Sequence, residues 1–281
     1  MEKKKRIGID VGGTKMHFAL IEEEKVIREI RLVTNAQGTQ EEVLKEIENG
    51  IRELIDDSVE GIGIGVPGLV ETKLGIVFNV ANIPAWKNVP IKEKLESIFN
   101  IPVYIGNDAN CFALGEKFCG KGKPFSNVVG LSLGTGVGAG IIVNDKLHIG
   151  NHSIAGEFGG IRYLDADYES YCSGKFFTRQ YHTDALTFSK LAEQGNEEAL
   201  TAFIKFGMHL AQLIETIMLS YGPDAIILGG SLSKSYRFFA DSLKNELRDF
   251  PHQKVVDSTQ ILVSDNSAIP VLGAAELVNQ K

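Results

Sequence analysis

The sequence is poor in cysteine and has no long hydrophobic run, and each shortage excludes a class of protein. Only three of its 281 residues are cysteines (Cys111, Cys119 and Cys172), and no two of them stand at CxxC spacing. This predicts neither a disulfide framework nor a cysteine zinc module. No uninterrupted apolar segment approaches the ~18 residues of a membrane span. Asp10 also interrupts the apolar stretch after the basic N-terminus too early for a signal peptide. We therefore expect a cytoplasmic protein without membrane contact.

The sequence also lacks a large excess of positive charge. Its 36 acidic and 29 basic side chains leave a net charge of −7, whereas a protein that binds nucleic acid through a broad face is usually markedly basic. We therefore expect no nucleic-acid partner, although a few local donors can still hold a small anion. Glycine, by contrast, is in excess: 30 of 281 residues, about 11%, against about 7% in an average protein.

The same order of predicted elements occurs twice along the chain: three strands, a helix, a strand, a helix, a strand and a helix. The first copy comprises strands 6–11, 14–21 and 26–33, helix 40–55, strand 59–66, helix 91–99, strand 101–105 and a helix after Asp108. The second comprises strands 128–133, 137–143 and one from Leu147, a long helix ending at Tyr221, strand 224–228, helix 234–247, strand 260–263 and helix 268–278. Strands interleaved with helices predict the α/β class, here as two similar lobes with a cleft between them.

The length of the chain predicts two domains, and a loop predicts the boundary between them. At roughly 150 residues per domain, a chain of this length divides into two domains. We place the boundary near residue 120, in the loop that ends at Pro124. The lobes are then 1–120 and 121–267, and we expect the C-terminal helix within 268–281 to join the first lobe.

Each half begins with a glycine-rich hairpin, and these two hairpins are the strongest chemical signal in the sequence. Asp10-Val-Gly12-Gly13-Thr14-Lys15 opens the first half, and Leu133-Gly134-Thr135-Gly136-Val-Gly-Ala-Gly140 opens the second. Backbone N–H groups without side chains around them make concavities that hold phosphate oxygens. Either segment alone could be an ordinary tight turn. Their equivalent positions in the two halves favour phosphate binding, with Asp10 suited to Mg²⁺ or to a water bound to it.

Two other glycine patterns do not stand in the context that their chemistry requires. Gly115 to Lys121 fits part of a P-loop, but Gly122 stands where Ser or Thr should bind Mg²⁺, and a helix rather than a strand precedes the loop. Gly63 to Gly68 fits a dinucleotide-binding pattern, but Pro67 makes a turn there and no helix opens at the third glycine. We interpret both as coincidental.

Taken together, these segments resemble the ROK family (repressors, open reading frames and sugar kinases) of the actin-like, hexokinase-like ATPase superfamily, over essentially the whole chain. Seven motifs in the family's order carry the resemblance: Asp10-Val-Gly-Gly-Thr-Lys15, Gly65-Val-Pro-Gly68, Asn82-Ile-Pro-Ala-Trp86, Asn107-Asp-Ala-Asn110, Leu133-Gly-Thr-Gly-Val-Gly138, Ala155-Gly-Glu-Phe-Gly159 and Gly229-Gly-Ser231. The resemblance implies actin-like, ribonuclease H-like lobes and ATP-dependent phosphorylation of a hexose hydroxyl, the 6-hydroxyl by our expectation, with Mg²⁺.

The resemblance also implies roles for particular residues. Asp108 matches the family's catalytic base, which would accept the proton of the sugar hydroxyl; an Asn-Asp pair at a helix start can also be a cap, a role that Asn107 or Asn110 could fill. Sugar hydroxyls would be bound by Gly68, Asn82, Asn107, Asp108, Glu157 and Glu169. ATP would be bound by Asp10, Gly12, Gly13, Thr14, Lys15, Gly134, Thr135, Gly136, Gly229 and Gly230, the last two near adenine and ribose. The surroundings of Glu169 depart from the family pattern.

The sequence departs from the family most clearly at its zinc motif. Many members have a histidine three residues after the AGE glutamate and a nearby CxCGxxGC cluster, but this chain has Gly160 at the histidine position and only Cys172 in the cluster region. We therefore predict no structural zinc. The missing histidine would also have touched the sugar near its anomeric end, so the specificity of zinc-containing glucokinases does not transfer directly. Glucose is the first expected acceptor, and N-acetylmannosamine, N-acetylglucosamine and β-glucosides are the alternatives.

Two non-enzymatic alternatives and an oligomeric state complete the expectations. The family's repressors have a helix-turn-helix segment ahead of the first glycine loop, for which the residues before Asp10 leave no room. A sugar-binding sensor without catalysis is the second alternative, which the presence of Asp108 and of both loops disfavours. The resemblance also implies a homodimer.

Overall fold

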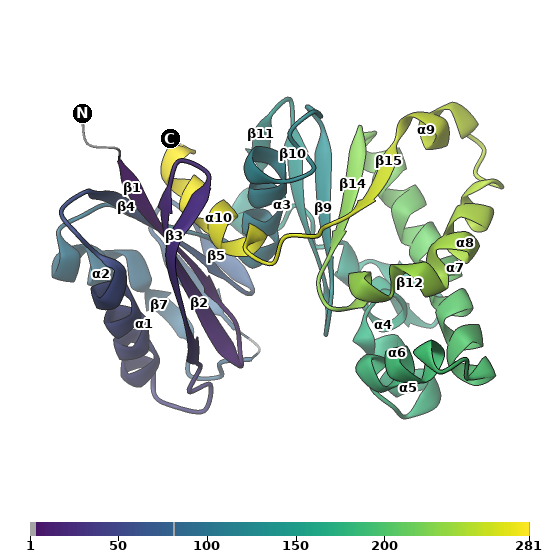
Figure 1. The fold of residues 1–281 in the computed structure, drawn as a ribbon, viewed down its shortest axis with the longest axis horizontal. Helices are drawn as coiled ribbons and strands as arrows, with labels where there is room; N and C mark the ends of the chain where they lie inside the picture. Colours follow the sequence, from purple (N-terminus) through teal and green to yellow (C-terminus); the bar gives the residue numbers. More distant parts are fainter. Residues whose placement is uncertain (1–3, 81, 281) are drawn as a thin grey trace. The chain divides into compact units, whose positions relative to one another are not determined.

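The computed structural model describes residues 4–80 and 82–280 and confirms the α/β class. Its first elements are β1 (Lys5–Val11), β2 (Lys15–Glu22), β3 (Lys25–Val33), α1 (Gln40–Leu54), β4 (Val59–Val66), β5 (Leu69–Glu71), β6 (Ile76–Asn79), β7 (Lys87–Pro90), α2 (Ile91–Phe99), β8 (Val103–Asn107) and α3 (Asp108–Cys119). Figure 1 shows these elements from purple to blue.

The remaining elements follow in the predicted order, with additional short ones between them. They are β9 (Val128–Leu133), β10 (Val137–Val143), β11 (Lys146–His148), β12 (Arg162–Tyr163), β13 (Ala166–Asp167), α4 (Tyr168–Cys172), α5 (Gly174–Tyr181), α6 (Ala185–Glu193), α7 (Glu197–Tyr221), β14 (Ala225–Gly229), α8 (Tyr236–Leu247), α9 (Gln253–Ser258), β15 (Gln260–Val263) and α10 (Ile269–Glu276). Short 3₁₀ turns are η1 (Asn151–Ser153), η2 (Phe158–Gly160), η3 (Leu232–Ser235) and η4 (Leu277–Asn279).

The first five-stranded sheet has the order β3-β2-β1-β4-β8, with β1 antiparallel to β2 and parallel to β4, and β4 parallel to β8. Figure 1 shows α1 and α2 on one side of this sheet and α10 on the other. Helix α1 begins at a capping box, in which Thr39 accepts the N–H of Glu42 and the Glu42 side chain accepts the N–H of Thr39. Its apolar residues at helical spacing, such as Val43 and Ile47, are fully buried against the sheet.

Helix α10 packs closely on the sheet because glycines face it. A Cβ added to Gly8 in β1 would lie 2.0 Å from the carbonyl oxygen of Val271, and one added to Gly63 in β4 would lie 1.8 Å from that of Ala274. On the helix side, a Cβ at Gly273 would lie 1.7 Å from the carbonyl oxygen of Cys111 in α3. The glycines thus allow backbone-to-backbone contact among the sheet, α10 and α3.

The second five-stranded sheet has the order β11-β10-β9-β14-β15, with β14 parallel to both β9 and β15. It repeats the strand order of the first sheet, since in each sheet the third, second and first strands of the copy are followed by two further strands in parallel pairing. The long helix α7 packs on α8 at Gly207, whose missing Cβ would lie 2.6 Å from the carbonyl oxygen of Phe239. Fully buried phenylalanines, including Phe203 and Phe206, fill this helical layer.

The chain forms two compact units that do not follow a single cut in the sequence. One unit contains the residues up to Pro124, Gly140–Ala155 and the residues from Asn266 on, and the other contains Phe125–Ala139 and Gly156–Asp265. The C-terminal helix α10 therefore belongs to the same unit as β1. The candidate residues around Asp108 lie in the first unit, and Glu157, Glu169 and the second glycine turn lie in the second.

One described helix, α7, is long and apolar enough to cross a membrane by length and composition alone. More than half of its apolar segment is buried inside the protein, which is the state of a core helix in a soluble protein. It packs on α8 at Gly207, and its residues Phe203 and Phe206 are fully buried.

Two regions contain elements that the hydrophobic pattern does not reveal. The segment from Leu69 to Pro90 forms the small sheet β5-β6-β7, and the segment from Arg162 to Glu193 forms β12, β13 and helices α4 to α6. These elements are two to nine residues long, too short for a periodicity of side chains to show above chance.

The glycine contacts under α10 lead to a test of stability. We expect Gly63→Ala to lower the free energy of unfolding by about 3 kcal/mol or more, because the new methyl group would meet a helix backbone that cannot yield as a side chain can. Gly160→Ala is the control, because a Cβ there has nothing within 4 Å and should leave the thermal melting temperature nearly unchanged. Equal melting of both variants would contradict the packing described here.

Candidate active site

Two aspartates lie at the same edge of the first sheet. Asp10 is in β1, opposite Gly65 of the parallel strand β4, and Gly65 and Val66 are in turn opposite Gly106 and Asn107 of β8. Asp108 follows β8 directly and begins α3. Since the carboxyl ends of parallel strands meet at one edge of a sheet, the fold brings together two residues almost a hundred positions apart.

Burial makes both carboxyl groups weaker acids than usual, and the charge of Asp10 adds to the effect at Asp108. Burial, followed by the charge of Asp10, raises the pKa of Asp108 to about 7. Burial likewise raises the pKa of Asp10 to about 6, opposed by the nearby charge of Lys15. The Cys111 thiol lies in the same environment, and burial together with both carboxylates raises its pKa well above the ordinary value. The thiol therefore stays protonated at neutral pH, and the carboxylates are the groups that exchange protons.

Asn107 both caps α3 and holds the neighbouring turn. Its Oδ1 accepts the N–H groups of Ala109 at 2.9 Å and Asn110 at 3.2 Å, and its Nδ2 donates to the carbonyl oxygen of Gly68 at 3.1 Å. Of the two asparagines that could cap this helix, Asn107 does so, and Oδ1 of Asp108 accepts the N–H of Ala109 at 2.8 Å. Gly68 has φ +89°, and a Cβ there would lie 2.4 Å from the carbonyl oxygen of Asn79.

The first glycine turn is fixed by its own backbone and by the end of β3. The N–H of Gly12 donates to the carbonyl oxygen of Lys15 at 3.0 Å, and Thr34 donates through Oγ1 to the carbonyl oxygen of Gly12 at 2.7 Å. Gly13 lies against Asn82, since an added Cβ would be 2.5 Å from that of Asn82. The structure thus brings two predicted site residues, Gly13 and Asn82, into contact.

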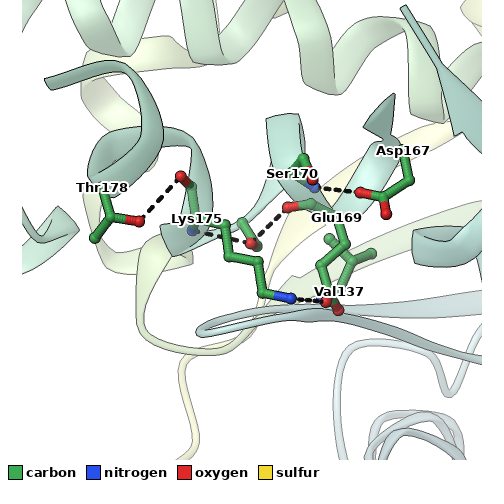
Figure 2. A network of polar contacts seen from close by, with 7 residues as sticks. Val137, Asp167, Glu169, Ser170, Lys175 and Thr178 are labelled. Atoms are coloured by element: carbon green, nitrogen blue, oxygen red, sulfur yellow. Dashed lines mark hydrogen bonds and ion pairs between the residues drawn. The ribbon is translucent and has the colours of Figure 1, made fainter. Parts of the chain in front are cut away.

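The second glycine turn is held by the segment that contains Glu169. Gly134 donates its N–H to the carbonyl oxygen of Gly136 at 3.0 Å, and Gly174 donates its N–H to the carbonyl oxygen of Gly134 at 2.8 Å. The Oε2 of Glu169 accepts the N–H of Val137 at 3.1 Å, and an added Cβ on Gly136 would lie 2.5 Å from that oxygen. Figure 2 shows this carboxylate between Val137 and Lys175.

The other predicted residues of the second unit lie on turns beside these strands. Gly230 has φ +80°, and a Cβ there would lie 2.3 Å from the carbonyl oxygen of Leu133, so the turn after β14 packs on the end of β9. Glu157 is exposed and immediately precedes η2. Gly159 lies in the same turn. A Cβ added to it would lie 3.0 Å from the carbonyl oxygen of Val137 and 3.4 Å from the Cβ of Glu169.

One charged residue near the second turn has no motif in the sequence to reveal it. Lys175 forms an ion pair with Oε1 of Glu169. An isolated lysine after Ser173-Gly174 carries no signal by itself, because its neighbours in space are set by the packing of α5 on the glycine turn.

The donor set at the sheet edge fits Mg²⁺. Mg²⁺ is usually held by one or two protein carboxylates together with water and phosphate oxygens, and Asp10 supplies one such carboxylate at this edge. Within residues 4–80 and 82–280, no three His, Cys, Asp or Glu side chains gather as a metal-binding group. Tyr163 stacks on Tyr168 with ring centroids 4.6 Å apart, and its hydroxyl is 3.1 Å from Nδ1 of His209.

The chain belongs to the ROK family, whose sequence pattern matches residues 6–281. The glucokinase of Thermotoga maritima is 28% identical to it, over 100% of this chain and 99% of that protein. The N-acetyl-D-glucosamine kinase of Citrobacter koseri is 32% identical over 80% of this chain and 84% of that protein. The ROK glucokinase of Streptomyces griseus, solved in complex with glucose and AMPPNP, superposes with a TM-score of 0.82 at 26% identity, over 99% of this chain and 100% of that one.

These relatives confirm the family resemblance and the two-lobed α/β architecture. Both sugar kinases and proteins named as xylose repressors are among the similar proteins. Membership of the family therefore does not distinguish a kinase from a repressor, and the activity has to be inferred from the residues of the site.

The raised pKa of Asp108 leads to a prediction about stability. The unfolded chain loses this proton near the ordinary pKa of 3.8, whereas the folded protein keeps it up to about pH 7. Stability from this group is therefore lost as the pH rises between those values. We expect Asp108→Asn to raise the free energy of unfolding by roughly 1–3 kcal/mol at pH 8 and by nearly nothing at pH 4.

The free energy of unfolding of both variants is measured by denaturant unfolding in buffer that contains a chelator. Asp56→Asn is the control, because the pKa of Asp56 is shifted in the opposite direction. Hydrogen bonds from Ser58 and Lys5 lower the pKa of Asp56 to about 2, so its loss should lower stability slightly at neutral pH. If Asp108→Asn is destabilised equally at pH 4 and pH 8, the pKa of this carboxyl group is not raised by burial in the folded protein.

Proposed function

We propose that this protein transfers the γ-phosphoryl group of ATP to a hexose hydroxyl, the 6-hydroxyl in our assignment. The observation that carries the proposal is the position of Asp108, at the carboxyl end of β8 beside Asp10, with a pKa near neutrality. A general base works best when its pKa lies near the operating pH, because it is then both deprotonated and able to hold a proton. The S. griseus structure with glucose and AMPPNP supports ATP and sugar as the two substrates.

In this proposal, Asp108 orients the acceptor hydroxyl and takes its proton as the oxygen attacks the γ-phosphorus. The sugar's other hydroxyls are bound by Gly68, Asn82, Asn107, Glu157 and Glu169. Asn107 suits this role because its amide is already immobilised by the cap of α3 and by Gly68. A pre-oriented amide loses little freedom when it binds a hydroxyl, so more of the interaction energy remains for binding.

The phosphate groups are bound by the two glycine turns, Gly12, Gly13 and Thr14 with Lys15 in the first and Gly134, Thr135 and Gly136 in the second. Backbone N–H groups in such turns point at an anion without a side chain in the way. Gly229 and Gly230 bind the adenosine part. Mg²⁺, held by Asp10 directly or through water, would neutralise charge that develops on the phosphate oxygens.

Glucose is the proposed acceptor, supported by the two sugar kinases of T. maritima and S. griseus. The C. koseri relative favours N-acetylglucosamine as an alternative, and N-acetylmannosamine and β-glucosides remain candidates because Gly160 has open space around it. A sugar sensor without catalysis is the second candidate function. We further propose a cytoplasmic homodimer without a zinc site, on the resemblance described above.

The proposed reaction is tested by ADP release with MgATP and six acceptors: glucose, fructose, mannose, N-acetylglucosamine, N-acetylmannosamine and a β-glucoside. We expect turnover on at least one of them. Asp108→Asn should lower it by two to four orders of magnitude, as loss of a general base does, while sugar binding by calorimetry stays within a few-fold. Sugar binding without turnover on any acceptor would favour the sensor, and undiminished turnover in the variant would remove Asp108 from the role of base.

A further inference from the structure

Lys175 stands beside the second glycine turn because the backbone before it is bonded to that turn. Gly174 donates its N–H to the carbonyl oxygen of Gly134 at 2.8 Å, and the Oγ of Ser173 accepts the N–H of Lys175 at 3.1 Å. Ser173 is fully buried and donates through Oγ to the carbonyl oxygen of Glu169 at 2.6 Å. The first residues of α5 are therefore fixed against Gly134, and the backbone of Lys175 lies next to the turn.

The ammonium group of Lys175 is directed to the turn by Glu169. One carboxylate oxygen of Glu169 pairs with Lys175, and the other accepts the N–H of Val137, the residue that follows Gly136. Figure 2 shows the lysine side chain extended along the carboxylate toward Val137. Gly136 has no side chain to separate this ion pair from the turn, since a Cβ there would lie 2.5 Å from Glu169.

The ion pair can exchange its carboxylate for another anion at little cost. The side chains of Lys175 and Glu169 are 54% and 31% exposed, and ion pairs so open to water contribute at most about 1 kcal/mol. Within the described part of the chain, the N–H groups of Thr135 and Gly136 meet no acceptor. An anion on the turn could therefore accept the N–H groups of Thr135 and Gly136. The exposed ammonium group of Lys175 lies beside them, on a backbone that is bonded to the turn.

We propose that Lys175 contacts a phosphate group of ATP on the Gly134–Gly136 turn, leaving Glu169 when the nucleotide binds, and that Glu169 positions the ammonium in the free protein. This inference rests on the proposed function, in which the turn binds phosphate. It adds a charged contact to a turn that the sequence predicted to act through backbone groups alone.

The test is calorimetric binding of AMP, ADP and ATP, each with Mg²⁺ and without sugar, to the wild type and to Lys175→Gln. A contact with an outer phosphate group should raise the dissociation constant for ATP by about 10-fold and leave that for AMP within twofold, because an ion-paired hydrogen bond is lost only where the phosphate is present. Lys175→Arg should recover most of the ATP affinity. Lys244→Gln, an exposed lysine near the end of α8, should bind all three as the wild type does.

Each other outcome overturns the inference in a distinguishable way. Equal ATP affinity in the wild type and Lys175→Gln would exclude Lys175 while leaving the proposed kinase intact. Parallel weakening of AMP and ATP would show that Lys175 only supports the shape of the turn. Absence of ATP binding by the wild type would overturn the proposed function together with the role of Lys175. Unchanged thermal melting of each variant confirms that the comparison is between folded proteins.

Discussion

The parallel pairing of β1, β4 and β8 is the constraint on which the candidate site depends. It aligns the carboxyl ends of the three strands, so that Asp10 at the end of β1 and Asp108 after β8 share one edge. Loss of hydration on burial raises the pKa of both carboxyl groups, and the charge of Asp10 raises that of Asp108 further. Perturbed pKa values cluster at functional sites, and proton acceptance by Asp108 and cation binding by Asp10 are the roles proposed for this pair.

Glycine serves two physical purposes in this fold. At Gly8, Gly63 and Gly273 it allows backbone contact between α10, the sheet and α3, which a methyl group would prevent. At Gly13 and Gly136 it forms tight turns that the side chains of Asn82 and Glu169 approach within contact. The excess of glycine in the composition is therefore shared between close packing and the turns that we propose bind phosphate.

The site is built from residues that already have structural partners. Asn107 caps a helix and holds the Gly68 turn, and Glu169 holds Val137 and Lys175. In the proposed function, the cap and the Gly68 contact hold the amide of Asn107 before substrate arrives, which lowers the entropy cost of binding, whereas the exposed ion pair of Glu169 and Lys175 is open to exchange. These shared contacts also mean that substitutions at these positions change the local structure as well as the chemistry, so binding and stability need to be measured side by side.

The sequence by itself determined the fold class, the order of the long elements and the family, because these follow from hydrophobic periodicity and from motifs of contiguous residues such as Asp10 to Lys15. The short elements between Leu69 and Pro90 and between Arg162 and Glu193 were not predictable, since too few side chains define their period. Only the tertiary structure decided that Asn107 caps α3, that Glu169 contacts the second glycine turn, and that Lys175 lies beside it. The cap is a local contact, but its choice between Asn107 and Asn110 depends on where β8 ends and α3 begins. The contacts that place Glu169 and Lys175 beside the second glycine turn join residues distant in the chain, and no local pattern encodes them.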